Sequence, residues 1–465
     1  MRSKVVAVLL AALALLVATA GIGVSAPPES HHFITRPDLS PPVVRIDTPA
    51  NGTEPGSIFV APHGTAAQSG PMIIDDTGQP VWFQPVGDGA QLFTMDFKAQ
   101  TYQGQPVLTW WQGAPHPGYG DGEYVVLDRS YQQIATVRAG NGLKADLHEM
   151  VITPRNTALL IAYHTVQLDR PVVEGVVQEI DIATGAVLLD WRSLDHVALD
   201  ESTVPLPEDP AAPYDYLHLN SITEDADGNL LISARHTDTI YQVDRATGDV
   251  RWRLGGKRSD FAADPDAVFA RQHDARWQPD GTMSLFDNAA SEPGPVSRGL
   301  VLAVDQEART ARVVREFKHP GGGTSVSQGD HQVLPGGNSF VGWGSQPEFT
   351  EFDQNGEVVL HGSLGDGMPS YRAFRLPWAG TPTEPPVAAL NDDTVYASWN
   401  GATEVRTWRV LAGPAPDQLN PVADVPKAGF ETSAPLPSPA PYAAVEALDA
   451  NGQVLSRSEP VPAGA

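Results

Sequence analysis

Three histidines occupy the same place in a repeated pattern of short β-strands. Counting back eight residues from the turn of a strand pair gives His148 and His273, and counting back ten from a longer turn gives His218. The same count gives Asp96 in another copy of the pattern. Neutral imidazole acts as a nucleophile, a proton carrier or a metal ligand, so several at one position indicate a reactive site.

A second set of side chains lies seven residues beyond each turn, on the strand that follows. Its members are Trp111, Tyr163, Arg235 and Asn288. A planar guanidinium holds an anion with two parallel hydrogen bonds, and aromatic walls stack on a flat ring. The two sets together suit an aromatic anion, with Trp111 and Tyr163 against the ring and with Asp96 and Asn288 as further substrate-binding candidates.

Each of these residues also has a structural interpretation. A histidine, aspartate or asparagine at a strand end can bond a neighbouring loop, an arginine can form a salt bridge, and an aromatic residue can pack in a core. Three neutral imidazoles can also bind Zn²⁺. Repetition at one register in separate copies favours a shared reactive site, whereas His331 lies two residues off the register and is treated as peripheral.

The strands that must position these residues recur around a turn that reads Asp-x-x-Thr-Gly or a close relative. The first aspartates of the turns are Asp75, Asp128, Asp181, Asp244, Asp305 and Asp353. A period of roughly 50 to 60 residues made of alternating strands is typical of a propeller blade. A second hairpin precedes most copies, so we predict six four-stranded blades, an all-β six-bladed β-propeller, over residues 57–380.

The two ends of the chain differ from this pattern. Residues 1–26 have the basic start, apolar stretch and small residues of a signal peptide, which predicts secretion, with an uncleaved anchor as the alternative. Residues 27–56 are proline-rich and read as an irregular lead-in. Residues 387–465 contain alternating strands that predict a small β-sandwich of the fibronectin type III or immunoglobulin-like kind.

The composition excludes several classes of protein. Of the 465 residues, 56 are Asp or Glu and 30 are Lys or Arg, which gives a formal net charge of -26. Phosphate-rich surfaces repel such a chain, so we expect neither nucleic acid nor, beyond the signal segment, a membrane as partner. The chain has no cysteine, so disulfides and thiolate metal sites are excluded. It also lacks a phosphate-binding loop, a zinc-protease helix and a Gly-x-Ser-x-Gly elbow, and we expect no cofactor and no metal.

Five segments together resemble the arylsulfate sulfotransferase (ASST) family. They are YLHLNSI (Tyr216 to Ile222), LLISARH (Leu230 to His236), WRLGG (Trp252 to Gly256), QHDARW (Gln272 to Trp277) and LFDN (Leu285 to Asn288). Their order and spacing also match, and the likeness spans roughly residues 57–380. The additional C-terminal sandwich is similar to the longer, actinobacterial-type branch of the family.

The resemblance implies transfer of a sulfuryl group from an aryl sulfate to a phenolic acceptor, without a nucleotide and through a transiently sulfated histidine. It gives that role to His273, the histidine of QHDARW, and maps other family residues to His218, Arg235 and His148. The family's active-site threonine has no clear counterpart among the hydroxyl residues of the matching blade, Thr324, Ser325 and Ser327. The expected partners are small aromatic molecules, and the oligomeric state stays open.

Two other classes of function compete with this interpretation. The Asp-x-x-Thr-Gly runs that are followed by a Trp at 181–191 and 244–252 resemble the blade motif of pyrroloquinoline quinone propellers. A propeller can also bind a partner on its face without catalysis, with the terminal sandwich as an adhesive module. The shared histidines and the arginine favour catalysis, because neither alternative needs them at one register.

Overall fold

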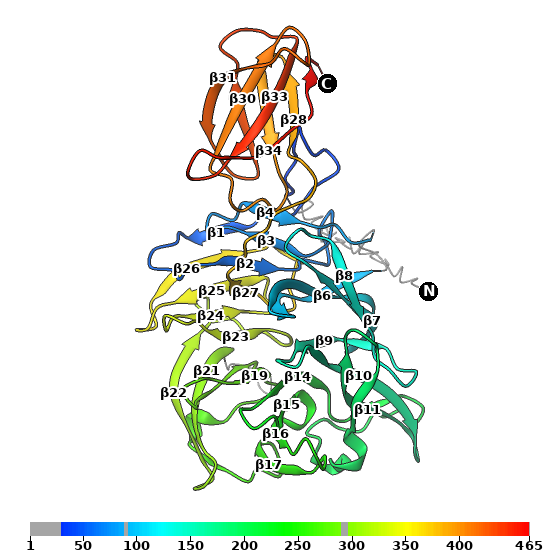
Figure 1. Cartoon of the computed structure of the whole chain (residues 1–465). Coiled ribbons are helices and arrows are strands. Elements are labelled where there is room, and N and C mark those ends of the chain that lie inside the picture. Colours follow the sequence, from blue (N-terminus) through cyan, green and yellow to red (C-terminus); the bar gives the residue numbers. More distant parts are fainter. Residues whose placement is uncertain (1–28, 88–91, 290–295, 465) are drawn as a thin grey trace, which may run out of the picture.

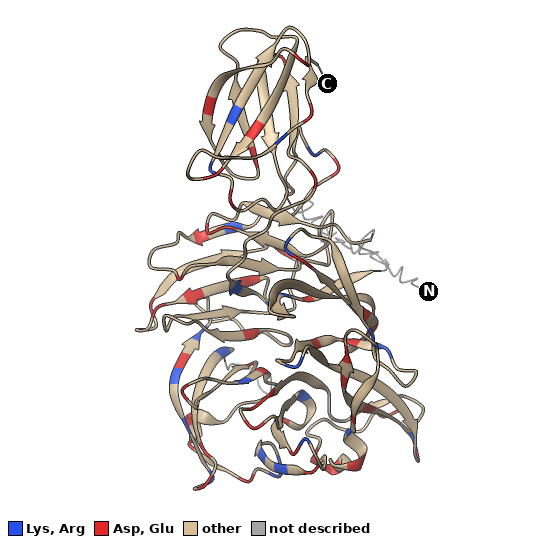
Figure 2. Ribbon diagram, viewed as in Figure 1, with Lys and Arg blue, Asp and Glu red and all other residues tan. Residues whose placement is uncertain are grey.

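The chain is almost entirely β-structure, with a propeller and a separate pair of sheets at one end (Figure 1). The computed structural model describes residues 29–87, 92–289 and 296–464, so the predicted signal peptide lies outside the described residues. Among the helices in those ranges, none is long and apolar enough to cross a membrane. Acidic and basic residues are both spread through the blades (Figure 2).

Within the described residues the first half of the propeller has three blades. Blade 1 contains β2 (Ser57–Val60), β3 (Met72–Ile74), β4 (Pro80–Phe83) and, at its other edge, β27 (Phe374–Leu376). Blade 2 contains β5 (Phe93–Tyr102), β6 (Gln105–His116), β7 (Tyr119–Leu127) and β8 (Gln133–Val137). Blade 3 contains β9 (Ala145–Ile152), β10 (Thr157–Gln167), β11 (Pro171–Asp181) and β12 (Val187–Arg192).

Three further blades complete the ring. Blade 4 contains β14 (Leu219–Glu224), β15 (Leu230–Ala234), β16 (Thr239–Val243) and β17 (Val250–Gly255). Blade 5 contains β19 (His273–Trp277), β20 (Met283–Asp287), β21 (Arg298–Asp305) and β22 (Thr310–Lys318). Blade 6 contains β23 (Asp330–Val333), β24 (Ser339–Gly342), β25 (Glu348–Phe352) and β26 (Val358–Ser363). This arrangement confirms the predicted six-bladed propeller.

Short elements join or extend the blades. Two of them add a strand to a blade: β13 (Tyr214–Asp215) pairs with β11, and β18 (Ala262–Ala263) pairs with β22. The 3₁₀ turns are η1 (Ser193–Asp195), η2 (Leu199–Glu201), η3 (Arg235–Thr237) and η4 (Pro265–Ala267). The lead-in is not wholly irregular, because β1 (Arg45–Thr48) pairs with β26 as the outermost strand of blade 6.

The repeated turn aspartates determine where the outer hairpins close. In every copy the carboxylate accepts a backbone N–H from two or three residues further on, which satisfies the turn without a ladder partner. These aspartates are Asp75, Asp128, Asp181, Asp244, Asp305 and Asp353. The repeat seen in the sequence therefore marks one turn in each blade.

The apolar core of the propeller lies between the blades. Among the described residues one cluster of buried side chains lies at each of the six contacts between neighbouring blades. Large members include Phe59, Trp82, Trp111, Tyr216, Tyr241, Phe286 and Trp343. Each such side chain contributes roughly 1.5–3 kcal/mol by leaving water. The inner strands β5, β9, β14 and β19 are held rigidly around the central channel as a result.

The C-terminal strands form two sheets with a common core. One sheet contains β28 (Val387–Asn391), β29 (Thr394–Ser398) and β32 (Glu431–Pro435). The other contains β31 (Asn420–Pro426), β30 (Thr407–Gly413), β33 (Tyr442–Leu448), β34 (Val454–Arg457) and β35 (Val461–Pro462). Both contribute to one cluster around Trp408. The Asn400 side chain bonds both backbone groups of Phe83, which fastens these sheets to blade 1.

Candidate active site

A cavity of about 530 Å³ lies where the inner strands of several blades begin. The structure brings together the three histidines of the shared register, because His148, His218 and His273 all line this cavity. His148 lies in β9, His218 immediately precedes β14, and His273 is the first residue of β19. Arg235, from η3 at the end of the second strand of blade 4, lines it as well.

Breaks in the strand register aim these side chains into the channel. The ladder shifts in β14 between Leu219 and Ser221, and in β19 between His273 and Arg276. Such bulges bend a strand and turn a side chain away from the regular alternation. His218 adopts the left-handed conformation with φ of 54°. The local backbone therefore departs from regular strand geometry at the residues that line the cavity.

His273 is held in one tautomer by Asn288. The Asn288 amide nitrogen donates to the carbonyl oxygens of Ser325 (3.0 Å) and Gln328 (2.9 Å), which leaves the amide oxygen to accept from Nδ1 of His273 at 2.6 Å. The lone pair is then on Nε2, where the backbone N–H of Gln328 lies at 3.3 Å. Burial and the neighbouring Arg235 lower the pKa of His273 well below its ordinary value, so the ring is neutral.

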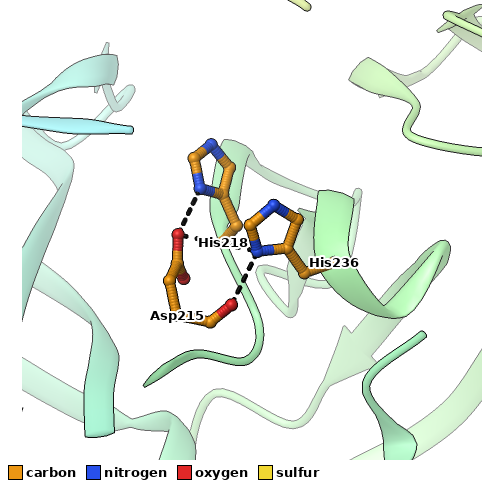
Figure 3. Close-up of side chains that lie close together, drawn as sticks. All are labelled: Asp215, His218 and His236. Carbon is orange, nitrogen blue, oxygen red and sulfur yellow. Dashed lines mark hydrogen bonds and ion pairs between the residues drawn. The ribbon is translucent and has the colours of Figure 1, made fainter. Parts of the chain in front are cut away.

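His218 and His236 both turn toward Asp215 (Figure 3). Nδ1 of His218 lies 2.6 Å from Oδ2 of Asp215, and Nδ1 of His236 lies 2.7 Å from the Asp215 carbonyl oxygen. Burial lowers the pKa of His218 although Asp215 opposes the shift. Burial and His218 lower the pKa of His236 to about 3. The two rings are 4.6 Å apart between centroids.

His148 has a carboxylate partner of its own. Its Nδ1 lies 2.5 Å from Oδ1 of Asp146, whose Oδ2 accepts the backbone N–H of Gly120 at 2.8 Å. The ring is buried, and its centroid is 5.0 Å from that of His218. Two adjacent imidazoles in the cavity are therefore each oriented by an aspartate, and each can carry a proton.

Arg235 is tied at both of its terminal nitrogens. One donates to Nε2 of His236 at 2.9 Å, which a neutral ring can accept, and the other donates to the carbonyl oxygen of Val326 at 2.9 Å. Its Nε is buried and has no hydrogen-bond partner among the described residues. A fixed guanidinium with donor capacity to spare suits an anion with several oxygens.

One group of residues has the geometry of a metal site. The potential ligand atoms of Asp215, His218 and His236 all lie within 4.8 Å of one another, and this is the group found among the described residues (Figure 3). Asp215 binds Nδ1 of both histidines through the hydrogen bonds described above, while its Oδ1 is buried without a partner among the described residues. Arg235 also lies against the outer nitrogen of His236 and would repel a cation there.

Asp96 lies outside the cavity lining and belongs to a buried ionic network, here called the channel floor. Its members are Asp96, Lys98, Glu149, Asp274, Arg276 and Arg372. Lys98 and Arg372 bind the Asp96 carboxylate at 2.8 and 2.9 Å. The register of β5 shifts between Met95 and Lys98, and Asp96 has a φ of 52°, so the bulge turns Asp96 into the floor.

The structure places the expected aromatic residues behind the cavity lining, with the Tyr163 ring 6.2 and 6.3 Å from those of His148 and His218 between centroids. Trp111 is fully buried and donates its indole N–H to the carbonyl oxygen of Ala145 at 2.9 Å, so it is part of the core. Tyr163 donates to the carbonyl oxygen of Leu219 at 2.7 Å. Neither is among the residues that line the cavity, and Asn288 acts on His273 from behind.

Several cavity residues were missed by the sequence analysis. They are His116, Tyr119, Asp215, His236, Gln328 and Tyr371. Asp146 and Asp215, two and three residues before a cavity histidine, are a signal that could have been found. Of the three hydroxyl residues considered, Ser327 is the one that lines the cavity. Tyr371, from the segment before β27, had no signal in the sequence.

Comparison with protein families gives a match over the propeller. The model of the family described as arylsulfotransferase (ASST) matches residues 98–365, which is more than half of the chain. This range includes His148, His218, Arg235 and His273. The match favours sulfuryl transfer over the quinoprotein and binding-module interpretations. No curated protein sequence matches the chain.

Solved structures with similar folds are distant in sequence. A protein of unknown function from Bacteroides caccae is 13% identical, with 69% of this chain and 98% of that chain covered and a TM-score of 0.43. An inactive variant of virginiamycin B lyase from Staphylococcus aureus, with quinupristin, is 10% identical, with 79% and 97% covered and a TM-score of 0.31. A structure titled Dos1 propeller is 12% identical, with 71% and 72% covered and a TM-score of 0.31.

Proposed function

Because the chain belongs to the arylsulfotransferase family, we propose that it moves a sulfuryl group from an aryl sulfate to a phenol, through a sulfated His273 and without a nucleotide. The observation that carries this proposal is the fixed tautomer of His273. Asn288 holds the Nδ1 proton, so the lone pair is on Nε2, where it accepts only the long hydrogen bond from the Gln328 backbone N–H at 3.3 Å, in a cavity that also contains a guanidinium. A neutral ring that carries its lone pair on the nitrogen facing the substrate is the form in which histidine attacks.

The first half of the reaction transfers the group to the protein. Nε2 of His273 attacks sulfur, an N–S bond forms, and the S–O bond to the aryl oxygen breaks. Arg235 lines the same cavity, and the backbone N–H of Gln328, which leaves Nε2 when that nitrogen bonds sulfur, is a second donor that can hold the sulfuryl oxygens. Stabilisation of the charge on these oxygens is the main requirement of such transfers.

A proton is transferred to or from the phenol oxygen in each half of the reaction. His148 or His218 begins the cycle as the imidazolium beside its aspartate, gives its proton to the leaving phenolate, and regains a proton from the incoming phenol as that phenol attacks the sulfur. Asp215 and Asp146 stabilise the charged imidazolium that forms in each cycle. His273 is restored when the N–S bond breaks, so atoms and charge balance over the cycle.

The test is the intact mass of the protein after brief incubation with 4-nitrophenyl sulfate and no nucleotide, with an alkaline quench. We expect one added sulfuryl group, mapped to His273, and release of 4-nitrophenol. His273→Asn should remove both. The matched control is His164→Asn, because His164 is half exposed in β10 and outside the cavity, and this variant should still carry the adduct.

Two results would contradict the proposal. Full turnover in His273→Asn would show that His273 is not the nucleophile. A wild-type protein that gains no mass and transfers nothing to added phenol would leave a binding propeller as the better interpretation.

A further inference from the structure

The lining of the cavity is divided into two chemically different halves. Blades 4, 5 and 6 contribute polar groups, among them Arg235, His236, His273 and Gln328. Blades 2 and 3 and the segment before β27 contribute all of the large apolar side chains, listed here, together with His116 and His148: Met95, Pro115, Pro117, Tyr119, Leu147 and Tyr371. A molecule with an anionic end and an aromatic end is complementary to this division.

The tip of the β6–β7 hairpin, residues 115–119, supplies half of the apolar surface. Pro115 and Pro117 are exposed although they are apolar, and Tyr119 is only partly buried. Gly118 has a φ of 92°, and a Cβ at this position would lie 3.3 Å from Cε1 of His218. The tip therefore reaches over the proton-carrying histidines and limits the space beside them.

The hairpin is fixed in this position and is not a free loop. A Cβ at Gly120 or Gly122 would lie 2.7 or 2.5 Å from the Trp111 indole, so these glycines let the strands close over the ring. The backbone N–H of Gly120 bonds Asp146, the partner of His148. The indole in turn bonds blade 3 at Ala145. The hairpin and His148 are thus connected through the Asp146 carboxylate.

We propose that the hairpin tip is the surface on which the aromatic rings of donor and acceptor lie, and that it selects phenols with a single ring. This inference rests on the proposed function. The ring lies between the tip and Tyr371, with its oxygen toward His218 and the sulfuryl group toward His273 and Arg235. The Tyr119 ring, 5.4 Å from that of Tyr163 between centroids, is backed by a second aromatic residue and does not yield to a larger substrate.

In this arrangement the hairpin tip contacts the substrate ring and not the reacting atoms. The effect of removing a tip side chain on KM and kcat follows from this. An interaction that is equal in the ground state and the transition state changes KM and leaves kcat unchanged. Tyr119→Ala should raise KM for 4-nitrophenyl sulfate about tenfold with little change in kcat. It should also shift the ratio of kcat/KM about tenfold toward the two-ring 4-methylumbelliferyl sulfate, because the ring that limits the space is gone.

The experiment measures kcat and KM for both sulfates with phenol as acceptor. Wild type is compared with Tyr119→Ala and with Pro117→Gly, which keeps the chain length and loosens the tip. Glu123→Gln is the control on the same hairpin, because Glu123 pairs with Arg138 outside the cavity and should behave as wild type. Melting temperatures check that each variant is folded.

The outcomes separate this inference from the proposed function. If wild type turns over neither sulfate, the proposed function fails, and the inference about the hairpin tip fails with it. If wild type is active but both tip variants keep its KM and its ratio of kcat/KM, the ring does not lie on the tip and this inference is overturned. A raised KM with a shifted ratio in both variants supports it.

Discussion

The cavity and the channel floor are built from consecutive residues of the same inner strands, yet their chemistry is opposite. His148 and His273 line the cavity, and the next residues, Glu149 and Asp274, belong to the floor. The floor gathers charged side chains that are paired with one another. The cavity gathers imidazoles around the Asp215 carboxylate, and the guanidinium that lines it, that of Arg235, has an unpartnered Nε among the described residues.

The difference shows how one strand can serve structure and reaction at adjacent positions. In the floor Arg372 bonds Asp96 at 2.9 Å and Glu149 at 3.0 Å, so burial is compensated by charge. Although burial alone would raise the pKa of Glu149, Arg276 and Arg372 hold it below its ordinary value. In the cavity burial lowers the pKa of His218, His236 and His273, and Asp215 opposes this shift only in part at His218 and His236. Buried charges that are paired with one another make the floor rigid. Buried imidazoles with a lowered pKa supply the reactive groups of the cavity.

The largest expected effect is on stability, from removing the central cation of the floor. Arg372→Met leaves three carboxylates together without their shared partner, and breaking such a buried pair costs about 3–5 kcal/mol. The free energy of unfolding, from denaturant titration, should fall by that amount. The His273 adduct should still form in the folded fraction.

An exposed pair supplies the control for this prediction. Arg409 bonds Asp424 at 3.1 Å on the surface of the C-terminal sheets. Arg409→Met should leave the free energy of unfolding close to that of wild type, because solvent screens the pair. Equal losses in the two variants would mean that the floor has no special role.

The second prediction concerns the tautomer of His273. Asn288→Ala removes the nearer of two acceptors of the Nδ1 proton and leaves the Arg271 carbonyl oxygen at 3.0 Å, so the proton is held less firmly on that nitrogen and the lone pair at Nε2 is lost part of the time. We expect adduct formation to slow by a factor of about 100 or more, by analogy with other misoriented catalytic imidazoles. Rapid-quench mass measurement gives this rate.

A buried asparagine outside the cavity separates this effect from simple destabilisation. Asn338 bonds the carbonyl oxygen of Gly52 at 3.1 Å and Glu351 at 2.8 Å in blade 6. Asn338→Ala should lower stability in a similar way but leave the rate of adduct formation in the folded protein unchanged. A slowed rate in both variants would assign Asn288 a structural role only.

The repeated turns and the shared register were visible in the sequence because they are local. An aspartate that caps its own turn leaves the same pattern in each copy, so the six blades could be predicted from it. Counting from the turns then placed His148, His218 and His273 at equivalent points. These inferences need only the length of a hairpin and the direction of its strands.

The errors arose where the position of a residue depends on contacts between blades. The bulge in β5 turns Asp96 into the floor, and no count along the chain reveals a bulge. Trp111 is enclosed by glycines of its own hairpin and capped by Ala145 of the next blade, so the expected stacking surface is in the core. The hairpin tip was missed for the same reason, because its neighbour His218 belongs to blade 4.

The third prediction tests the donor capacity of Arg235. A lysine cannot keep the bonds to His236 and Val326 and still present a fork to the sulfuryl oxygens. Arg235→Lys should lose about 2 kcal/mol of transition-state stabilisation, measured as kcat/KM, with little change in melting temperature. Arg155→Lys, at a partly exposed ion pair with Glu224, should keep wild-type activity. An unchanged rate in Arg235→Lys would return Arg235 to a structural role.

The smallest expected effect is the dependence of stability on pH that follows from the lowered pKa of His236. The pKa of His236 is about 3 in the folded protein against an ordinary value of 6.5, so the unfolded chain takes up the proton first as the pH falls. The contribution is therefore present above about pH 6.5 and is lost below it, by roughly 1–2 kcal/mol between pH 7 and pH 5. Asp215, His218 and Arg235 surround the ring and remain in His236→Gln, which should show a shallower fall over that range in denaturant titrations. Asp96 acts in the opposite direction, because burial raises its pKa and protonation at low pH then favours the folded state. Equal slopes for wild type and His236→Gln would mean that the ring is already charged in the folded cavity, and the contrast between cavity and floor would not hold at this residue.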